Sequence, residues 1–253
     1  MAFTITTSKF DLLIKKCIDL SSVYKSSYVC VANVHMCMEA YRNQKFKKIV
    51  NDADLVTADG MPLVLALKFL FGIKQDRISG MDMLPALLSS AEEKGLSVFF
   101  YGGTEIMLEK TRYHINNHYP KLAKHHYYSP PFRMLSNEEE NDVINLINAT
   151  KPNLVFVALG CPKQEKWMAS MRGKINACMI GIGGSLPVMI GMQKRAPKWM
   201  QKTSLEWFFR LLQEPIRLFK RYFITNSLFV YYLTLELIRV RIFKLNPKLI
   251  IYK

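Results

Sequence analysis

The sequence predicts an α/β domain with a mainly parallel sheet, followed by a helical appendage at the C-terminus. Two observations predict the domain: apolar runs of strand length alternate with longer helical segments, and each strong run is apolar throughout. Continuous apolar runs are expected of strands that are covered on both faces. The third observation is a basic, aromatic stretch at the end of the chain. We therefore predict a core of residues 1–195 and an appendage of residues 196–253.

The predicted elements follow one another regularly along the core. Strands are expected at 28–33, 54–58, 97–101, 154–159 and 177–182, with a weaker one at 125–128. Helices are expected at 34–50, 62–71, 82–94, 105–118 and 137–149. The last of these helices has a clear start, because Ser136 is followed three residues later by Glu139, as in a capping box.

Composition and charge narrow the class of protein. Half of the 253 residues are hydrophobic and 22% are charged, which predicts a packed core and excludes global disorder. The net charge of +15 is unevenly spread, because residues 193–253 hold thirteen Lys or Arg against three Glu. Such a field favours a polyanion or an anionic membrane surface as partner, and charge alone does not choose between them.

The cysteines, the histidines and the N-terminus indicate a cytoplasmic protein without a metal site. The five cysteines form no C-x-x-C pair and several lie in apolar runs, so we expect reduced thiols. His114 and His118 are four residues apart, but no H-E-x-x-H motif accompanies them. The first residues, MAFTITTSKFDLLIKK, lack the apolar run of a signal peptide.

Small and polar residues follow the predicted strands, where ligands bind in open α/β sheets. Glycine pairs stand at Gly102-Gly103 and Gly183-Gly184, and Gly160 follows a further strand. A tight turn explains any one of them, but together they favour a nucleotide or sugar-nucleotide site, because glycine lets the backbone approach an anion. The sequence has neither G-x-G-x-x-G after the first strand nor G-x-x-x-x-G-K-[ST], which excludes the usual dinucleotide and P-loop signatures.

Asp59 is the strongest single candidate for a functional residue. It follows the apolar run LVTA and precedes Gly60, a place that suits a carboxylate facing a cleft. There it would act as a general base or bind a ribose or a metal. An equally good explanation is that Asp59 caps the helix that starts near Pro62. The residues alone leave both explanations open.

Other polar residues at the strand ends leave similar alternatives open. Asn33 and His35 follow the first strand, and a lone histidine there is typical of a structural hydrogen-bonder. Gln164 suits contact with a substrate from the start of a helix, or simple exposure. Arg77 and Asp82 suit an anion or a sugar, or the cap of the helix that follows.

The appendage is predicted to begin as an amphipathic helix, opened by a capping box at 203–206. Charged residues follow on one stripe at helical spacing: Glu206, Arg210, Glu214, Arg217 and Arg221. Pro215 should kink or break this helix. The alternative is a solvated stripe held by pairs of Arg210 with Glu206 and Glu214, each worth roughly 0.2–0.5 kcal/mol.

Residues 222–238 form an apolar segment without Lys or Arg, in which Glu236 is the single charge. As a helix this segment would run about 25 Å, short of the roughly 30 Å hydrocarbon core of a bilayer. Basic clusters flank it, which favours a helix that lies on an anionic cytoplasmic leaflet. A membrane span and a buried helix that packs or forms a homo-oligomer remain the alternatives.

Six motifs, in this order, resemble the WecG/TagA/CpsF glycosyltransferases, glycosyltransferase family 26. They are TADGMPLV, RISGMDML, FFYGG, VALGCPKQEKWM, GIGGSLPVMIGMQKRAPKWMQ and LEWFFRLLQEPIRLFKRY. The RAP-x-W…LEW-x-x-R-L…EP-x-R series is highly specific, and the resemblance covers most of the chain. It implies a Rossmann-like α/β core with a C-terminal appendage and no required metal or other cofactor.

The resemblance also implies an activity. The enzyme would be cytoplasmic and peripheral on the inner face of the cell membrane. It would move a sugar from a UDP-sugar, such as UDP-N-acetylmannosamine or its uronic acid, onto an undecaprenyl-diphosphate-linked saccharide with inversion. The implied partners are this donor, the polyprenyl-diphosphate-linked acceptor and the anionic membrane surface, with no nucleic acid.

The resemblance assigns roles residue by residue. Asp59 occupies the position proposed for the family's general base, which turns the even choice above toward catalysis. The predicted substrate-binding residues are Asn33, Arg77, Gly102, Gly103, Gln164, Gly183, Gly184, Arg210, Arg217 and Arg221. One departure concerns Val31, where the family often has threonine. The missing hydroxyl leaves the identity of donor and acceptor open.

Two other classes of function fit parts of the sequence. A nucleotide-dependent oxidoreductase uses a similar sheet, but the missing G-x-G-x-x-G motif argues against it. A non-enzymatic protein that binds nucleic acid or scaffolds a membrane would place stacking aromatic residues along its basic stripe. Here the aromatic residues cluster in the apolar tail instead.

Overall fold

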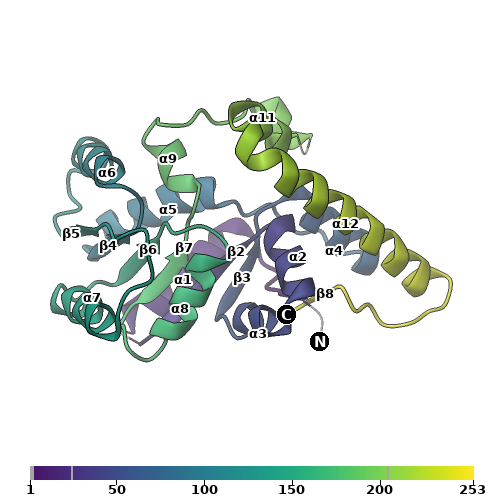
Figure 1. The fold of residues 1–253 in the computed structure, drawn as a ribbon, viewed down its shortest axis with the longest axis horizontal. Helices are drawn as coiled ribbons and strands as arrows, with labels where there is room; N and C mark the ends of the chain where they lie inside the picture. The colour runs from purple at the N-terminus through teal and green to yellow at the C-terminus, as the bar shows by residue number, and fades with distance from the viewer. Residues whose placement is uncertain (1–2, 24, 204) are drawn as a thin grey trace.

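A parallel β-sheet forms the centre of the protein (Figure 1). The computed structural model describes residues 3–23, 25–203 and 205–253. Within these ranges the sheet contains β2 (Ser27–Ala32), β3 (Leu55–Ala58), β4 (Val98–Tyr101), β5 (His125–Tyr128), β6 (Leu154–Val157) and β7 (Cys178–Gly181). Their order is β3-β2-β7-β6-β4-β5, and every neighbouring pair is parallel. The predicted fold class and the six predicted strands are confirmed.

Helices cover both faces of this sheet, which explains why its strands are mostly apolar and buried, apart from the edge strand β5. One face carries α1 (Phe10–Ser22), α5 (Gly80–Glu93), α6 (Glu105–His118) and α9 (Ser185–Met189). The other carries α2 (Val34–Arg42), α3 (Gln44–Asn51), α4 (Met61–Phe71), α7 (Asn137–Ala149) and α8 (Lys163–Met171). Successive strand residues enter opposite cores: Val29 lies in one and Cys30 in the other, and both are fully buried.

The strand order reverses beside β2, which lies between β3 and β7. The chain passes from β2 to β3 on one side, and its later strands lie on the other side. At such a switch point the connections that follow neighbouring strands diverge and leave a crevice at the carboxyl ends. Asn33 follows β2 there, and Gly183 follows β7.

The predicted helix 34–50 is wrong in one respect, because α2 and α3 are separate helices that meet at Asn43. Asn43 has an extended backbone, with φ −125° and ψ 105°. Its side chain accepts a hydrogen bond of 3.0 Å from the Phe46 N–H, while its own N–H donates to the Glu39 carbonyl. Asparagine competes for backbone hydrogen bonds in this way, so it ends one helix and caps the next.

The core is followed by α10 (Lys198–Lys202), α11 (Glu206–Gln213) and α12 (Pro215–Arg241). The predicted break at Pro215 is confirmed, since α12 begins there. The predicted capping box at 203–206 is wrong. Thr203 Oγ1 donates to the Trp199 carbonyl at 2.9 Å, and α11 starts after Leu205 without a side-chain cap. Ser204 lies outside the described residues.

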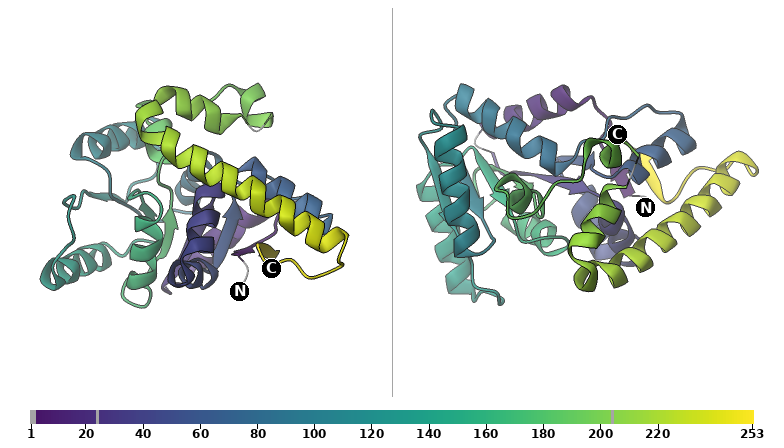
Figure 2. Two further views of the ribbon diagram at one scale, coloured as in Figure 1. Left: turned by 45° about the vertical axis from the view of Figure 1, so that its right-hand side comes forward. Right: turned by 90° about the horizontal axis from the view of Figure 1, so that it is seen from above.

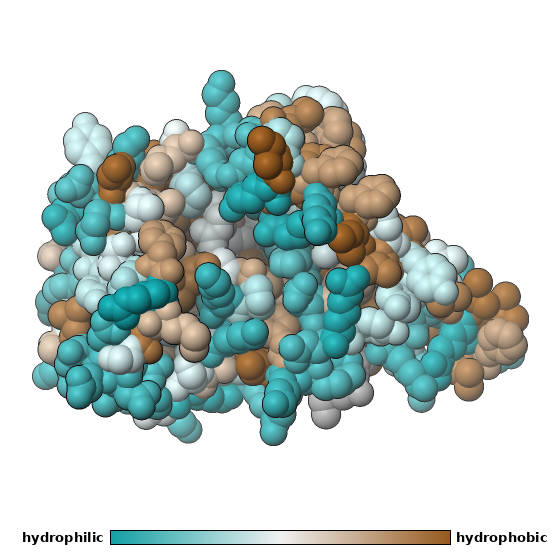
Figure 3. Space-filling model, in the orientation of Figure 1, coloured by the Kyte–Doolittle hydropathy of each residue, from teal (hydrophilic) through white to brown (hydrophobic). Residues whose placement is uncertain are grey.

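Helix α12 runs along the edge of the core and extends beyond it at its C-terminal end (Figures 1 and 2). Its inner face is buried at Leu218, Thr225 and Phe229, and it packs against α2 and α4. Exposed apolar side chains gather over α11 and α12 (Figure 3): Trp207, Phe208, Leu212, Ile216, Phe219, Phe223, Val230, Tyr231, Leu235 and Ile238. By length and composition alone, α12 is able to cross a membrane, and 17% of its most apolar 18-residue stretch is buried.

The chain turns back to the core after α12. Strand β8 (Ile250–Tyr252) pairs in parallel with β1 (Phe3–Ile5), and Phe3 lies opposite Ile250. Ile5 and Ile250 are fully buried, so the last residues of the chain contribute to the packing of the core. Neither strand was expected from the sequence.

Candidate active site

A cavity of about 410 Å³ opens at the carboxyl ends of β3, β2, β7 and β6. The residues that follow these strands form its floor, among them Asn33, Asp59 and Gly183. Helices α11 and α12 contribute the opposite wall, which includes Arg210 and Arg221. The cavity therefore lies between the core and the appendage, at the switch point of the sheet, and its size suits a small-molecule ligand.

Most of the predicted site residues line this one cavity: Asn33, Asp59, Arg77, Gln164, Gly183, Gly184, Arg210, Arg217 and Arg221. Gly102 and Gly103 are not among the described residues that line it. They follow β4, which is separated from β7 by β6, so the strand order places their turn to one side of the cavity. Their φ angles of +103° and +85° require glycine in that turn.

The backbone fixes Asp59 at the end of β3. Its N–H donates to the carbonyl of Ala32 at 2.8 Å, which holds it beside the end of β2. Its side chain does not cap the following helix within the described structure: the N-cap position of α4 is Gly60, and no side-chain cap bond is present there. The carboxyl of Asp59 is thus available to the cavity.

The surroundings of Asp59 favour its protonated form. Burial raises the pKa of the Asp59 carboxyl to about 7, and the negative charge of Glu206 adds to this rise. The positive charges of Arg77 and Arg210 and a hydrogen bond from the Gly80 N–H act in the opposite direction. A carboxyl with a pKa near neutrality can accept and release a proton at physiological pH, which suits a general base.

Asn33 and His35 stand at the start of α2. Asn33 is its N-cap, and the side-chain oxygen accepts a hydrogen bond of 3.1 Å from the Met36 N–H. His35 also lines the cavity. Burial and the charge of Arg221 lower the pKa of His35, which favours a neutral ring, while Glu39 acts against them. No described group hydrogen-bonds the buried Nδ1 atom of His35.

Gln164 supports the glycine turn after β7. Its Oε1 accepts from the Gly160 N–H at 3.1 Å, and its Nε2 donates to Glu165 at 2.8 Å. A Cβ atom at Gly181 would lie 2.7 Å from Nε2 of Gln164, and one at Gly183 would lie 3.2 Å from Oε1. Glycine is therefore needed for this close approach, and Gln164 holds the wall of the cavity as well as lining it.

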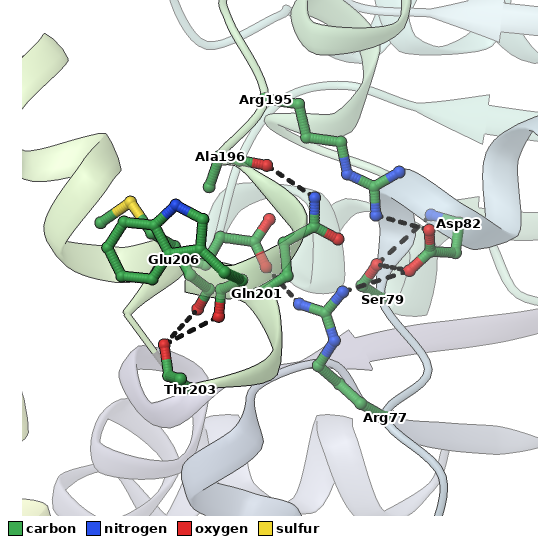
Figure 4. A network of polar contacts seen from close by, with 10 residues as sticks. Arg77, Ser79, Asp82, Arg195, Ala196, Gln201, Thr203 and Glu206 are labelled. Atoms are coloured by element: carbon green, nitrogen blue, oxygen red, sulfur yellow. Dashed lines mark hydrogen bonds and ion pairs between the residues drawn. The ribbon is translucent and has the colours of Figure 1, made fainter.

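Arg77 and Asp82 lie at the centre of a polar network that joins the core to the appendage (Figure 4). Asp82 accepts from the Ser79 hydroxyl at 2.6 Å and pairs with Arg77 at 3.3 Å and with Arg195. Arg77 also forms an ion pair with Glu206 of α11. Although burial opposes it, these hydrogen bonds and charges hold the pKa of Asp82 below its usual value. Ser79, rather than Asp82, is the N-cap of α5.

Arg210 reaches the glycine turn from α11. A Cβ atom at Gly184 would stand 2.3 Å from Nη2 of Arg210. The pairing of Glu206 with Arg210, expected for a solvated stripe, is replaced by the pairing of Glu206 with Arg77. The start of the stripe therefore faces the cavity rather than solvent.

Arg217 and Arg221 bring further positive charge from α12. Arg217 pairs with Glu214 three residues earlier, and the guanidinium of Arg221 lies 5.3 Å from the ring centre of Tyr222. Within the described structure the buried Nε of Arg221 has no hydrogen-bond partner. Both arginines line the cavity.

Some cavity residues were missed by the sequence analysis. The sequence places Glu206 in a capping box and on the charged stripe, Trp207 on the amphipathic helix, and Tyr222 and Asn226 in the apolar segment 222–238, but all four line the cavity. Their positions depend on how the appendage folds back over the core, and no local pattern encodes that. Across the described ranges, no three His, Cys, Asp or Glu residues come together in a group that could hold a metal ion.

A carboxylate at the switch point of a parallel sheet, faced by several arginines, suits an α/β protein that binds an anionic ligand. Comparison with known proteins gives the family. Residues 1–242 match the model of the "Glycosyl transferase WecG/TagA/CpsF family". The chain therefore belongs to this family, as its motifs predicted, and it is a glycosyltransferase.

The relatives of this chain include enzymes with a stated reaction. It is 32% identical over 194 residues to the N-acetylglucosaminyldiphosphoundecaprenol N-acetyl-beta-D-mannosaminyltransferase of Bacillus spizizenii (strain ATCC 23059 / NRRL B-14472 / W23), covering 76% of this chain and 74% of the relative. It is 31% identical over 190 residues to the enzyme of the same name from Staphylococcus aureus (strain MW2), covering 74% and 72%.

Proposed function

We propose that this glycosyltransferase moves N-acetylmannosamine, its uronic acid or a related hexose from a UDP-sugar onto a polyprenyl-diphosphate-linked saccharide, in the synthesis of a cell-surface polysaccharide. N-acetylglucosaminyl-diphosphoundecaprenol is the first acceptor to consider, because it appears in the names of the relatives. The observation that carries the proposal is the position of Asp59 opposite Arg210, Arg217 and Arg221 in one cavity. These groups suit the two needs of the reaction: removal of a proton and stabilisation of a diphosphate.

The reaction is a single displacement at the anomeric carbon of the donor. The acceptor hydroxyl forms the new bond on the face opposite the nucleotide, and the Asp59 carboxylate takes its proton. The bond from the anomeric carbon to the phosphate oxygen breaks, its electron pair leaves with UDP, and the anomeric configuration inverts. The pKa of Asp59, raised to about 7, supports this role, which is typically worth about 10²–10⁴-fold in rate.

The arginines serve the leaving group. Negative charge grows on the UDP diphosphate as the bond to the anomeric carbon breaks, and fixed positive charge stabilises it. Arg210 is held beside Gly184 at the turn after β7. Arg217 and Arg221 come from α12. Among the described residues that line the cavity, the appendage therefore contributes three of the four arginines.

The appendage also brings the cavity to its acceptor, which a polyprenyl chain anchors in a membrane. The exposed apolar side chains of α11 and α12 and the basic residues Lys220, Arg239 and Arg241 support peripheral binding to an anionic cytoplasmic surface. The buried inner face of α12 supports an interfacial position, because a helix that left the core to span the bilayer would lose its packing against α2.

A transfer assay tests the proposal. The full chain is incubated with UDP-N-acetylmannosamine and an N-acetylglucosaminyl diphosphate that carries a short polyprenyl chain, and the product is analysed by mass spectrometry and NMR. We expect a product that is one N-acetylhexosamine heavier, with a β linkage from the α-linked donor. UDP-glucose and UDP-N-acetylglucosamine serve as competing donors. Failure of every UDP-sugar to support transfer would contradict the proposed donor class.

A further inference from the structure

A carboxylate reaches the cavity from the appendage, in a wall that is otherwise basic. Glu206 is the first residue of α11, its side chain is 15% exposed, and its Oε2 pairs with Arg77 of the core (Figure 4). Among the described residues, no group hydrogen-bonds its buried Oε1. A buried carboxylate oxygen without a partner is unfavourable for folding, so its presence calls for another explanation.

The charges around Asp59 indicate that Glu206 acts on the Asp59 carboxyl. The charged groups whose fields act on Asp59 are Glu206 and Arg210 from α11 and Arg77 from the connection between α4 and α5. The remaining titratable and charged groups of the described cavity lining are His35 from α2, Cys161 from the connection between β6 and α8, and Arg217, Arg221 and Tyr222 from α12. After burial, Glu206 is the largest cause of the raised pKa of Asp59, whereas Arg77 and Arg210 lower that pKa.

Loss of Glu206 would lower the pKa of Asp59. Asp59 would then face Arg77, Arg210 and the Gly80 N–H, all of which favour its ionised form, without an opposing carboxylate. Arg77 would also lose the partner that shares its charge, and only its 3.3 Å pair with Asp82 would remain. Burial would still raise the pKa of Asp59, but less than it does together with Glu206, and a carboxylate with a lower pKa is a weaker general base.

We propose that Glu206 is a positioning residue, which docks on Arg77 when α11 covers the cavity and thereby makes Asp59 a stronger base. This inference rests on the proposed role of Asp59. It gives the appendage a second function in the reaction: besides arginines for the diphosphate, it carries the negative charge that prepares the base. The ion pair of Glu206 and Arg77, 129 residues apart in the chain, therefore couples the closure of the appendage to proton transfer.

The test is the pH dependence of kcat for the full chain, with UDP-N-acetylmannosamine and the short-chain acceptor as substrates. The wild-type rate should fall on the acidic side with an apparent pKa near 7. In Glu206→Gln, which keeps the size of the side chain, we expect the acidic limb to move to lower pH by about one unit or more, with KM little changed. Glu236→Gln is the matched control, because Glu236 contacts the Lys248 N–H elsewhere in the appendage.

Arg77→Gln provides a second variant with the opposite sign. It removes a positive charge that lowers the pKa of Asp59, so its acidic limb should move to higher pH. The inference is overturned if the acidic limb of the Glu206→Gln profile coincides with that of wild type, whether or not KM rises. Glu206 would then act through substrate binding or packing alone. Asp59→Asn distinguishes failure of the proposed base from failure of the inference on Glu206. If Asp59→Asn is active, the base assignment fails. If Asp59→Asn is inactive but the acidic limb of Glu206→Gln coincides with that of wild type, only the inference on Glu206 fails.

Discussion

Nη2 of Arg210 lies only 2.3 Å from the place where a Cβ atom at Gly184 would stand. Gly184 has φ −71° and ψ 3°, a conformation that any residue adopts, so the backbone does not require glycine there. The glycine makes room for the arginine. This contact joins the turn after β7 to α11 and fixes a positive charge inside the cavity.

The first prediction follows directly. Gly184→Ala should lower kcat by about 10- to 100-fold, because the guanidinium of Arg210 must move away from the proposed site of the donor diphosphate. The free energy of unfolding should change by less than about 1 kcal/mol, since the clash is with the far end of a flexible side chain. Steady-state kinetics and urea unfolding measure the two quantities.

A double-mutant cycle controls this experiment. In an Arg210→Ala background, Gly184→Ala should have almost no further effect on kcat, because the displaced group is already absent. If the two substitutions instead reduce the rate independently, Gly184 serves the substrate by another route, and the contact with Arg210 is not its reason.

The second prediction concerns the membrane. Ile216 is 98% exposed and Phe219 is 61% exposed on the outer face of α12, so neither contributes much to folding. The double variant Ile216→Ser/Phe219→Ser should bind anionic liposomes at least about 100-fold more weakly, since each buried apolar side chain is worth roughly 1.5–3 kcal/mol. Liposome sedimentation with phosphatidylglycerol vesicles measures the affinity.

Phe132→Ser/Met134→Ser is the matched control for this variant. These two side chains are 87% and 93% exposed, but they lie between β5 and α7, far along the chain from the appendage. Their replacement should leave liposome binding unchanged, and equal losses in both double variants would show that binding does not depend on α12. Such surface variants are preferable to deletion of 196–253, because β8 pairs with β1 of the core.

The third prediction is a dependence of stability on pH. The raised pKa of Asp59 means that the folded protein keeps this proton up to about pH 7, whereas the unfolded chain releases it near pH 4. Between about pH 4 and pH 7, Asp59 is ionised in the unfolded chain but protonated in the folded protein, so the free energy of unfolding falls as pH rises through this range. Asp59→Asn should be more stable than wild type at pH 8, by about 1–4 kcal/mol, and similar to it at pH 4.

Urea unfolding at both pH values measures this difference. Asp142→Asn, an exposed position on α7, is the control and should leave the pH dependence unchanged. A wild-type pH dependence in Asp59→Asn would mean that the carboxyl titrates at its ordinary pKa in the folded protein.

Much of the fold could be predicted because its signals are local. Strands buried on both faces are mostly apolar, and this signal predicts every strand of the sheet except the edge strand β5, whose signal is weaker. The break at Asn43 was passed over because an asparagine that caps a helix looks like any polar residue on a helix surface. The pairing of β1 with β8 joins segments of three residues from opposite ends of the chain, too short for a hydrophobic pattern to indicate either.

In the candidate site, too, some residues could be predicted from local signals, and others depend on how distant segments pack together. Asp59 and Gly183 could be found because polar or glycine residues directly after buried strands meet at one edge of a parallel sheet. The turn of Gly102 carries the same signal, but the sequence does not give the order of the strands, which sets its place relative to the cavity. The position of Glu206 could not be predicted, because its partner Arg77 is distant in the chain.

The central claim is that Asp59 is the general base of glycosyl transfer, and a single-turnover measurement tests it most directly. Enzyme in excess over UDP-N-acetylmannosamine is mixed with the short-chain acceptor at pH 8, and product formation is followed for wild type and Asp59→Asn, with UDP affinity measured by calorimetry. The account predicts a transfer rate about 10²–10⁴-fold lower in the variant, with UDP affinity unchanged. A transfer rate close to that of wild type would contradict it.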